Sequence, residues 1–175
     1  MKLEILGYGH PILRKKCDPV EEITDEIKKL VADMIETMDA ADGVGIAAPQ
    51  VGRSIRLFVL RNYIEKEDGS MDLSPPIVYI NPKLTDPSSD MVEEVEGCLS
   101  IPGIKLKVLR PSSINVEAMD LDGNIFFEKL EGYNARVRMH ENDHINGVLF
   151  VDRIDTVTKK KIEPILKNLK KKLNG

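Results

Sequence analysis

The sequence predicts one domain of the α+β class, covering residues 1–175. Segments whose apolar residues follow helical spacing lie near both ends of the chain, and strand-like segments cluster between them instead of alternating with helices. The 175 residues are 42% hydrophobic and 31% charged, so the chain can bury a sizeable core without disulfides.

The first helix is expected at residues 24–39. Thr24 is a suitable N-cap, acidic residues follow in the first turn, and Asp42-Gly43 is a stop signal. The apolar residues at helical spacing predict its buried face, which consists of Ile27, Leu30, Val31, Met34, Ile35 and Met38.

Strands are expected in the middle of the chain. The segments IRLFVL (55–60) and IVYINP (77–82) have the apolar character of buried strands, and Pro82 is expected to end the second. Three further strands are expected at 105–111, 113–121 and 124–132.

Turns and loops are expected between these strands. Asp122-Gly123 is a hairpin signal between the last two strands. The glycine- and proline-rich segment 43–52 and the polar segment 61–74 are both expected to be loops or turns.

A second helix is expected within residues 133–150, where Asn134 can act as the N-cap. Residues spaced i, i+4, i+7 and i+11 would share one face of it, namely Tyr133, Val137, His140 and His144.

The last helix is expected from about Thr158 to Leu173, with Pro164 near its first turn. The C-terminal segment 158–175 is basic, because it holds seven lysines and one acid, Glu163. This charge fits a polyanionic partner such as ribosomal RNA, while a solvated amphipathic helix is an equally good interpretation.

From the sequence we expect neither a secretory signal nor an organelle transit peptide. The N-terminus lacks the long apolar region of a secretory signal, and no stretch approaches the roughly 18 apolar residues of a membrane span. The two cysteines, Cys17 and Cys98, do not suggest a disulfide framework, and Cys17 is expected to be a buried or edge thiol. We therefore expect a cytoplasmic protein with no membrane or DNA partner.

The segment His140-Glu141-Asn142-Asp143-His144 predicts a metal site. Residues at i and i+4 of a helix stack on one face, so both imidazoles can reach one metal ion. Glu141 would then lie beside a bound water, and Asp143 is expected to orient one of the histidines. A polar helix without a metal is the less favoured interpretation, because two of the three histidines in the chain have this spacing.

A catalytic metal of this type takes three protein ligands and keeps one position open. Two residues are candidates for the third ligand. Cys98 would complete a Cys/His/His site, and Glu163 would give the His/His/Glu set of a thermolysin-like metalloprotease. Cys98 is favoured, because a thiolate is a strong ligand for transition metals.

Three segments, taken together and in order, resemble the peptide deformylase family. They are Gly43–Gln50 (GVGIAAPQ), Glu96–Ser100 (EGCLS) and His140–His144 (HENDH). The first is neither a P-loop nor a G-x-G-x-x-G motif, and alone it indicates only a tight turn. The chain departs from the family pattern at Ile46 and Ile145, where leucine is usual, and at Met139, where glutamine is common.

The resemblance implies a role for each site residue. Cys98, His140 and His144 would bind one divalent metal, and Glu141 would move a proton from water to the leaving amine. The side-chain amide of Gln50 and the backbone N–H of Leu99 would form an oxyanion hole. Gly45 and Ile46 would line the substrate groove. We also expect Val137 and Ile46 to form part of a pocket for a methionine side chain.

The resemblance also implies a fold and a reaction. The H-E-x-x-H helix would be central, with β-sheets around it. The reaction would remove the formyl group from N-formylmethionine on newly made polypeptides, releasing formate. Fe²⁺ would be the metal in the cell, with Zn²⁺, Ni²⁺ or Co²⁺ as other occupants. The non-enzymatic alternative is a metal-stabilised domain that binds the ribosome.

Overall fold

The computed structural model describes residues 1–174, and within that range the chain forms three α-helices and nine strands. The helices are α1 (Asp25–Ala40), α2 (Gly132–Ile145) and α3 (Thr156–Asn174). The strands are β1 (Gly45–Ala47), β2 (Leu57–Leu60), β3 (Tyr63–Glu65), β4 (Met71–Leu73), β5 (Ile77–Thr85), β6 (Met91–Cys98), β7 (Ile101–Pro111), β8 (Ser113–Met119) and β9 (Ile125–Glu131). Short 3-10 helices occur at η1 (Pro11–Arg14), η2 (Ala48–Val51) and η3 (Phe150–Asp152).

The strands form one large sheet and two hairpins. The large sheet has five strands in the order β1-β2-β5-β8-β9, and β3–β4 and β6–β7 are separate two-stranded sheets. All the pairings between these strands are antiparallel. The predicted α+β class is therefore confirmed, and β1 is an edge strand of the large sheet.

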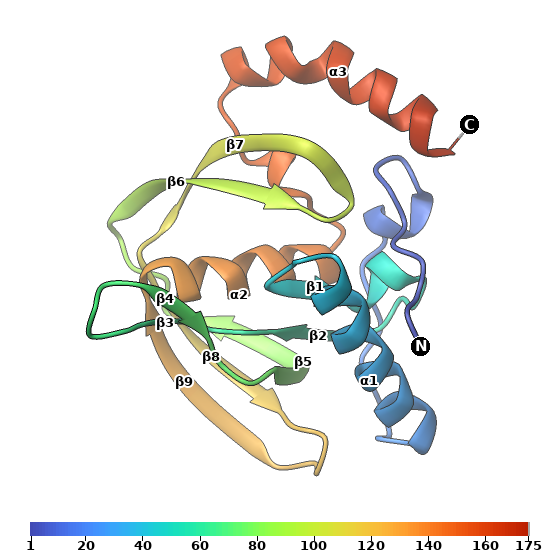
Figure 1. Ribbon diagram of the computed structural model, residues 1–175, viewed down its shortest axis with the longest axis vertical. Helices are drawn as coiled ribbons and strands as arrows, with labels where there is room; N and C mark the ends of the chain where they lie inside the picture. The colour runs from blue at the N-terminus through green and yellow to red at the C-terminus, as the bar shows by residue number, and fades with distance from the viewer. Residues whose placement is uncertain (175) are drawn as a thin grey trace.

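The helix α2 is central, as the family resemblance implied. It lies between the five-stranded sheet and the β6–β7 hairpin (Figure 1). The helix α1 packs against β1 and β2, and α3 lies on the far side of the β6–β7 hairpin from α2. Among the described residues, no helix combines the length and the apolar character needed to cross a membrane.

Three apolar clusters hold these layers together. One joins α2 to the sheet and includes Phe58 and Val137. A second joins α1 to the sheet and includes Met34 and Val59. A third lies between β7, η3 and α3 and includes Leu166. Each helix therefore buries apolar side chains against a sheet or hairpin, which is the main stabilising contribution to such a layered fold.

The first helix matches its prediction. It begins at Asp25, and the Thr24 hydroxyl accepts a hydrogen bond from the backbone N–H of Ile27 at 3.2 Å. Asp25 and Glu26 in the first turn favour the positive end of the helix dipole. Cys17 is buried in the cluster that contains α2, which agrees with the prediction of a buried or edge thiol.

Two segments predicted as loops contain short strands. Residues 43–52 include β1 and η2, and residues 61–74 form the β3–β4 hairpin. Strands of three residues show too little alternation for sequence patterns to reveal them. Their stability comes from the partner strand, which local sequence does not encode.

The prediction that Pro82 ends its strand is wrong, because β5 continues to Thr85. The pairing of β5 with β8 is irregular between Ile80 and Lys83, so the proline falls where the ladder needs no N–H. Asn81 has φ +51°, and its side chain bonds the backbone of Val20 in both directions, at 2.8 and 2.9 Å.

Asn134 does not cap α2, which begins at Gly132 with Glu131 as its N-cap. The Asn134 side chain instead bonds the backbone N–H and carbonyl of Tyr63, at 2.9 and 3.0 Å. This residue therefore attaches the β3–β4 hairpin to α2, a role that depends on contact between distant segments.

Pro164 lies inside α3 and not in its first turn, because the helix begins earlier than predicted, at Thr156. Asp155 stabilises the start of α3, since its carboxylate accepts hydrogen bonds from the backbone N–H and the hydroxyl of Thr158. The proline leaves one helical carbonyl without its N–H donor on this mostly exposed helix.

The close approach of the backbone at Gly147, just after α2, can be tested with Gly123 as a matched control. Gly147 has φ +75°, and an added Cβ would lie 2.6 Å from the carbonyl oxygen of Arg14. Gly123 has φ +83°, but an added Cβ would have nothing within 4 Å. We expect urea unfolding to show a loss of about 1 kcal/mol for Gly123→Ala and about 3 kcal/mol for Gly147→Ala. Equal losses would contradict the close approach at Gly147.

Candidate active site

Cys98, His140 and His144 come together in the structure. Their ligand atoms all lie within 4.8 Å of one another, and Cys98 Sγ is 3.3 Å from His144 Nε2. The histidines lie one turn apart on α2, and their rings are 5.1 Å apart between centroids. Cys98 ends β6, where the hairpin turns back into β7.

This donor set fits a transition metal. Ligand atoms bound at 2.0–2.3 Å to one tetrahedral ion lie about 3.3–3.8 Å apart. The Cys98 Sγ to His144 Nε2 distance of 3.3 Å falls in this range, and all the ligand atoms lie within 4.8 Å of one another. Both imidazoles are buried, with His144 1% exposed and His140 9% exposed. A thiolate and two imidazoles suit zinc, iron, nickel or cobalt, and no atom here selects among them.

Glu96 orients His140. Its Oε1 is 2.8 Å from His140 Nδ1, so the other ring nitrogen faces Cys98 and His144. Burial opposes a charge on Glu96, but its bonds to His140 and Arg110 hold the pKa of this carboxyl well below its usual range. Glu96 is therefore an anion that fixes the ring of His140, a candidate metal ligand.

Two buried arginines neutralise Glu96. Arg110 donates Nε and Nη2 to the two carboxylate oxygens at 2.6 and 2.9 Å, and Arg136 donates Nη1 at 2.7 Å. Arg110 comes from β7 and Arg136 from α2. The carboxylate thus ties both strands of the hairpin to the helix beneath it.

The expectation that Asp143 orients a histidine is wrong. Its carboxylate accepts hydrogen bonds from Arg110 at 2.9 Å and from Arg153 at 2.6 and 2.8 Å. The physical reason is helical geometry, because Asp143 precedes His144 and points about 100° away from it around the helix. Glu96, from a distant strand, provides the contact to His140 instead.

Burial and the neighbouring His140 lower the pKa of His144 well below its usual value. The imidazole of His144 is therefore neutral, which is the form that binds metals. Its Nδ1 is one of the few buried side-chain atoms that have no hydrogen-bond partner among residues 1–174.

Glu141 lies beside the ligand group. Its side chain is buried, and its Oε1 has no hydrogen-bond partner within the described part of the chain. Burial raises the pKa of this carboxyl to about 7. A carboxyl with such a pKa can take up and release protons near neutral pH.

Gly45 permits this arrangement. A Cβ at this position would lie 2.6 Å from Glu141 Oε2, so only glycine lets the β1 backbone approach the carboxylate. The strand β1 lies at the edge of the sheet, and Gly45 lines a cavity there. An extended peptide can pair with such an edge.

Gln50 lies on η2 with its side chain held at both ends. Oε1 accepts from the backbone N–H of Ala47 at 2.9 Å, and Nε2 lies 3.1 Å from Ser100 Oγ and 3.6 Å from Cys98 Sγ. Its amide N–H₂ group is therefore fixed next to the candidate metal ligand.

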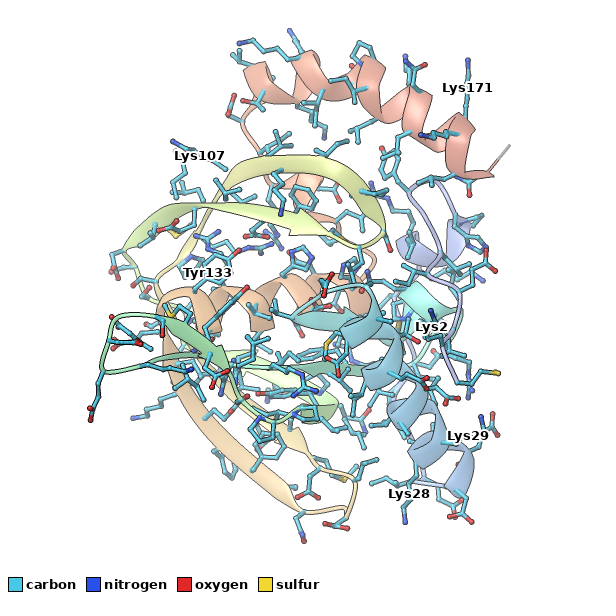
Figure 2. The ribbon with its side chains drawn as sticks, viewed as in Figure 1. Lys2, Lys28, Lys29, Lys107, Tyr133 and Lys171 are labelled. Carbon is cyan, nitrogen blue, oxygen red and sulfur yellow. The ribbon has the colours of Figure 1, made fainter. Side chains whose placement is uncertain are left out.

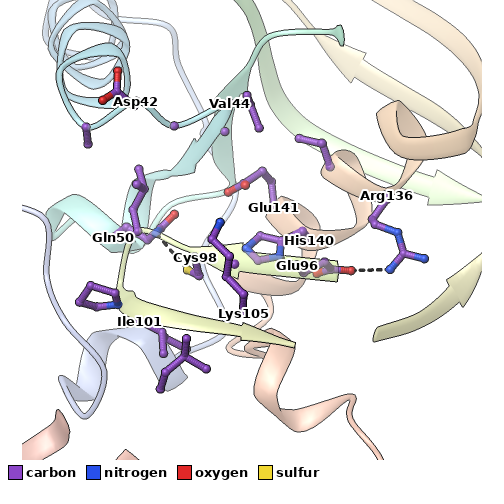
Figure 3. Close-up of a pocket in the computed structure, with 18 of the residues that line it drawn as sticks. Asp42, Val44, Gln50, Glu96, Cys98, Ile101, Lys105, Arg136, His140 and Glu141 are labelled. Atoms are coloured by element: carbon purple, nitrogen blue, oxygen red, sulfur yellow. Dashed lines mark hydrogen bonds and ion pairs between the residues drawn. The ribbon is translucent and has the colours of Figure 1, made fainter. Parts of the chain in front are cut away.

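A cavity of about 380 Å³ opens in front of these residues. Figure 3 shows Gln50, Cys98, His140 and Glu141 around it, with Lys105 projecting into it from β7. Leu99 and Gly45 also line it. Its apolar wall is formed by Val44, Tyr63, Tyr133 and Val137.

Ile46 does not line this cavity, although we expected its side chain to help form a pocket. It is fully buried in the cluster between α1 and the sheet. Side chains alternate across a strand, so Gly45 faces the cavity and Ile46 faces the other side. Tyr63 and Tyr133 form the wall instead, with ring centroids 5.5 Å apart in an edge-to-face arrangement.

Two further residues that the sequence singled out, Glu163 and Met139, lie outside the ligand group. Glu163 lies on α3 with an exposed side chain, 4.0 Å from Lys167, and is not part of the ligand group. Met139 is buried in the apolar cluster of α2 and the sheet. Sequence reasoning missed the roles of Glu96, Arg110 and Arg136, and no local pattern could have paired these residues.

Glu96→Gln tests the buried carboxylate. The buried Arg136 would lose its counter-ion and Arg110 would lose one of its two, so we expect the free energy of unfolding to fall by about 3 kcal/mol in urea titrations. The depressed pKa makes this contribution complete above the unfolded pKa of about 4.5, and it decreases as the pH falls further. Metal affinity, measured by chelator competition, should fall about ten- to hundredfold.

Glu94→Gln is the matched control, because Glu94 lies on the same strand but is exposed. We expect its stability and metal affinity to match those of the unaltered chain. Equal effects of the two substitutions would exclude a specific role for Glu96.

Known proteins resemble this chain over nearly its whole length. The family model for polypeptide deformylase matches residues 2–160. A peptide deformylase of Acinetobacter baumannii is 44% identical over 160 residues, covering 91% of this chain and 87% of that protein. One from Psychrobacter arcticus is 44% identical over 169 residues, covering 94% and 88%.

Solved structures of peptide deformylases have the same fold as this chain. Peptide deformylase from Thermotoga maritima is 41% identical with a TM-score of 0.80, covering 89% of this chain and 99% of that one. One from Arabidopsis thaliana is 38% identical with a TM-score of 0.87, covering 97% and 91%. With its sequence and its fold both matched, this chain belongs to the peptide deformylase family.

Proposed function

We propose that this chain removes the formyl group from N-formylmethionine at the start of new polypeptides, releasing formate and a free α-amine. The observation that carries the proposal is the Cys98, His140 and His144 group, with the partnerless carboxylate oxygen of Glu141 beside it. Membership of the peptide deformylase family supports the same reaction.

Cys98, His140 and His144 would hold one divalent metal. Such an ion supplies Lewis acidity and lowers the pKa of water from 15.7 to about 7. The sulfur and nitrogen donors suit Fe²⁺, Zn²⁺, Ni²⁺ and Co²⁺. We infer Fe²⁺ in the cell from the resemblance to the peptide deformylase family, with the other three as further occupants.

Glu141 would act as the proton shuttle. A buried carboxyl with a pKa of about 7 accepts a proton from the attacking water and then donates it to the leaving amine nitrogen. Gly45 leaves room for this carboxylate, because an added Cβ would lie 2.6 Å from Glu141 Oε2.

Gln50 and Leu99 would stabilise the tetrahedral oxyanion. The Gln50 side chain is held in place by Ala47 and Ser100, and its second N–H, which now faces Cys98 Sγ, would donate to the oxyanion. Leu99 follows Cys98 directly, and its backbone N–H would be the second donor. One such donor typically contributes about a hundred- to thousandfold in rate.

The peptide would bind along the edge of β1. Its backbone would pair with Gly45. The methionine side chain would enter the cavity and pack against the apolar wall formed by Val44, Tyr63, Tyr133 and Val137. An A. baumannii peptide deformylase was solved with Met-Ala-Ser bound, which makes formyl-Met-Ala-Ser a suitable substrate for the test.

The deciding experiment is formate release from formyl-Met-Ala-Ser by protein prepared without oxygen, with metal content measured on the same sample. Glu141→Gln should reduce kcat/KM about a hundred- to ten-thousandfold while the protein still binds metal. Full activity of this variant would exclude Glu141 as the proton shuttle, and an unaltered chain that binds metal but releases no formate would favour the non-enzymatic alternative.

Two further variants test the ligand set. Cys98→Ala should lose both metal and activity, because one of three ligands is missing. Glu163→Ala should keep both, since Glu163 is exposed on α3. The reverse pattern would support a metalloprotease with Glu163 as its third ligand.

We further propose a cytoplasmic enzyme that touches ribosomal RNA through α3. The lysines of α3 are exposed, and Lys171 points away from the body of the protein (Figure 2). Substituting Lys160, Lys171 and Lys172 by Gln should weaken binding to ribosomes and flatten its dependence on log salt by about one unit per lost phosphate contact.

The substitutions leave the buried side chains of Ile162 and Leu166 in place, so formate release from the free peptide should not change. Unchanged ribosome binding at several salt concentrations would remove the proposal.

A further inference from the structure

A chain of charged side chains connects the surface to the metal-ligand group. Arg153 binds Asp143, Asp143 binds Arg110, Arg110 binds Glu96, and Glu96 binds His140. Every link is between 2.6 and 2.9 Å long at its shortest contact. Its inner members are buried, whereas the Arg153 side chain is 45% exposed.

We propose that Arg153 is a positioning residue for the metal centre, acting on His140 through this chain. The inference rests on the metal site of the proposed function. It assigns Arg153 no contact with substrate or metal.

Arg153 reaches the site because the chain folds back after α2. The segment after the helix passes through η3, and Arg153 then lays its guanidinium along Asp143, with Nε and Nη2 each bonded to one carboxylate oxygen. The same segment places the Phe150 ring against the His140 ring, 5.9 Å between centroids. This segment therefore meets His140 directly through Phe150 and indirectly through Arg153.

The role of Arg153 follows from how Arg110 is shared. Arg110 lies between two carboxylates, with Nη1 on Asp143 and the Nε/Nη2 pair on Glu96. Because Arg153 neutralises Asp143, Arg110 can keep its two-pronged contact with Glu96.

Without Arg153, the buried Asp143 would have Arg110 as its remaining cation among its described partners. A buried carboxylate draws its counter-ion closely, because the cost of leaving it unpaired is large. The guanidinium of Arg110 would shift towards Asp143 and loosen its contact with Glu96. Arg136 would still hold one oxygen of Glu96, so the carboxylate would stay in place but be less well aligned with His140.

A purely electrostatic role and a positioning role of Arg153 predict opposite changes in metal affinity when this residue is replaced. Removing a positive charge by itself favours a nearby metal cation, although screening makes this effect small at a half-exposed residue. A positioning role predicts weaker metal binding. The sign of the change therefore separates the two effects.

The test uses the full chain loaded with Co²⁺, whose visible absorption reports ligand geometry. For Arg153→Met, we expect Co²⁺ affinity in chelator competition to fall about three- to tenfold, less than the loss typical of a direct outer partner. The Co²⁺ absorption bands should also shift. Arg153→Lys, which keeps the charge on Asp143, should recover most of the affinity.

Arg14→Met is the matched control. Arg14 has the same 45% side-chain exposure and makes a similar two-pronged contact with Asp152. It makes no hydrogen bond to the charged side chains that connect Arg153 with His140. Urea unfolding of each variant measures general loosening. We expect Arg14→Met to leave the Co²⁺ affinity and spectrum unchanged.

Three results would overturn the proposal: unchanged or tighter Co²⁺ binding in Arg153→Met, or the same weakening in Arg14→Met. Should Arg153→Met not fold, Arg153→Gln carries the same expectation. If the unaltered chain itself bound no Co²⁺, the proposed function would fail along with this inference. Normal Co²⁺ binding and formate release without an Arg153 effect would remove this inference alone.

Discussion

The active-site geometry depends on the buried carboxylate of Glu96. It bonds His140 and two arginines, and it lies on the strand that also carries Cys98. An unpaired charge in this position would be strongly unfavourable, so the β6–β7 hairpin can settle on α2 only in the register that satisfies Glu96. That register also delivers the Cys98 sulfur to His144.

The pairing of buried charges also explains how the polar helix α2 can lie at the centre of the fold. From Ala135 to Ile145, α2 is almost wholly buried, although it carries two arginines and several other ionisable side chains. Most of them are paired, as Arg138 is with Glu128 beside the Tyr79 ring. Among the ionisable side chains of α2, Glu141 and His144 each keep one buried atom without a hydrogen-bond partner in the described part of the chain. Both residues belong to the candidate active site.

The cavity is made by three elements that are remote in sequence. The edge of β1 supplies a backbone, the hairpin turn supplies Cys98 and Leu99, and α2 supplies the histidines. Gly45 is essential to this arrangement, because the absence of a side chain lets β1 approach Glu141 closely. The large sheet and α1 keep β1 in place through the side chain on its other face, Ile46.

The sequence by itself determined the α+β class, the capped first helix and the pairing of two histidines one turn apart. These features depend on spacing and capping within a few residues, which local patterns encode. The ordered motifs also indicated the family. The partner of His140, by contrast, lies 44 residues away on another element, and Asp143 turned out to face Arg110 and Arg153. Only the tertiary structure decided these contacts and the short strand β1, because they arise from which surfaces pack together, and no local pattern records that choice.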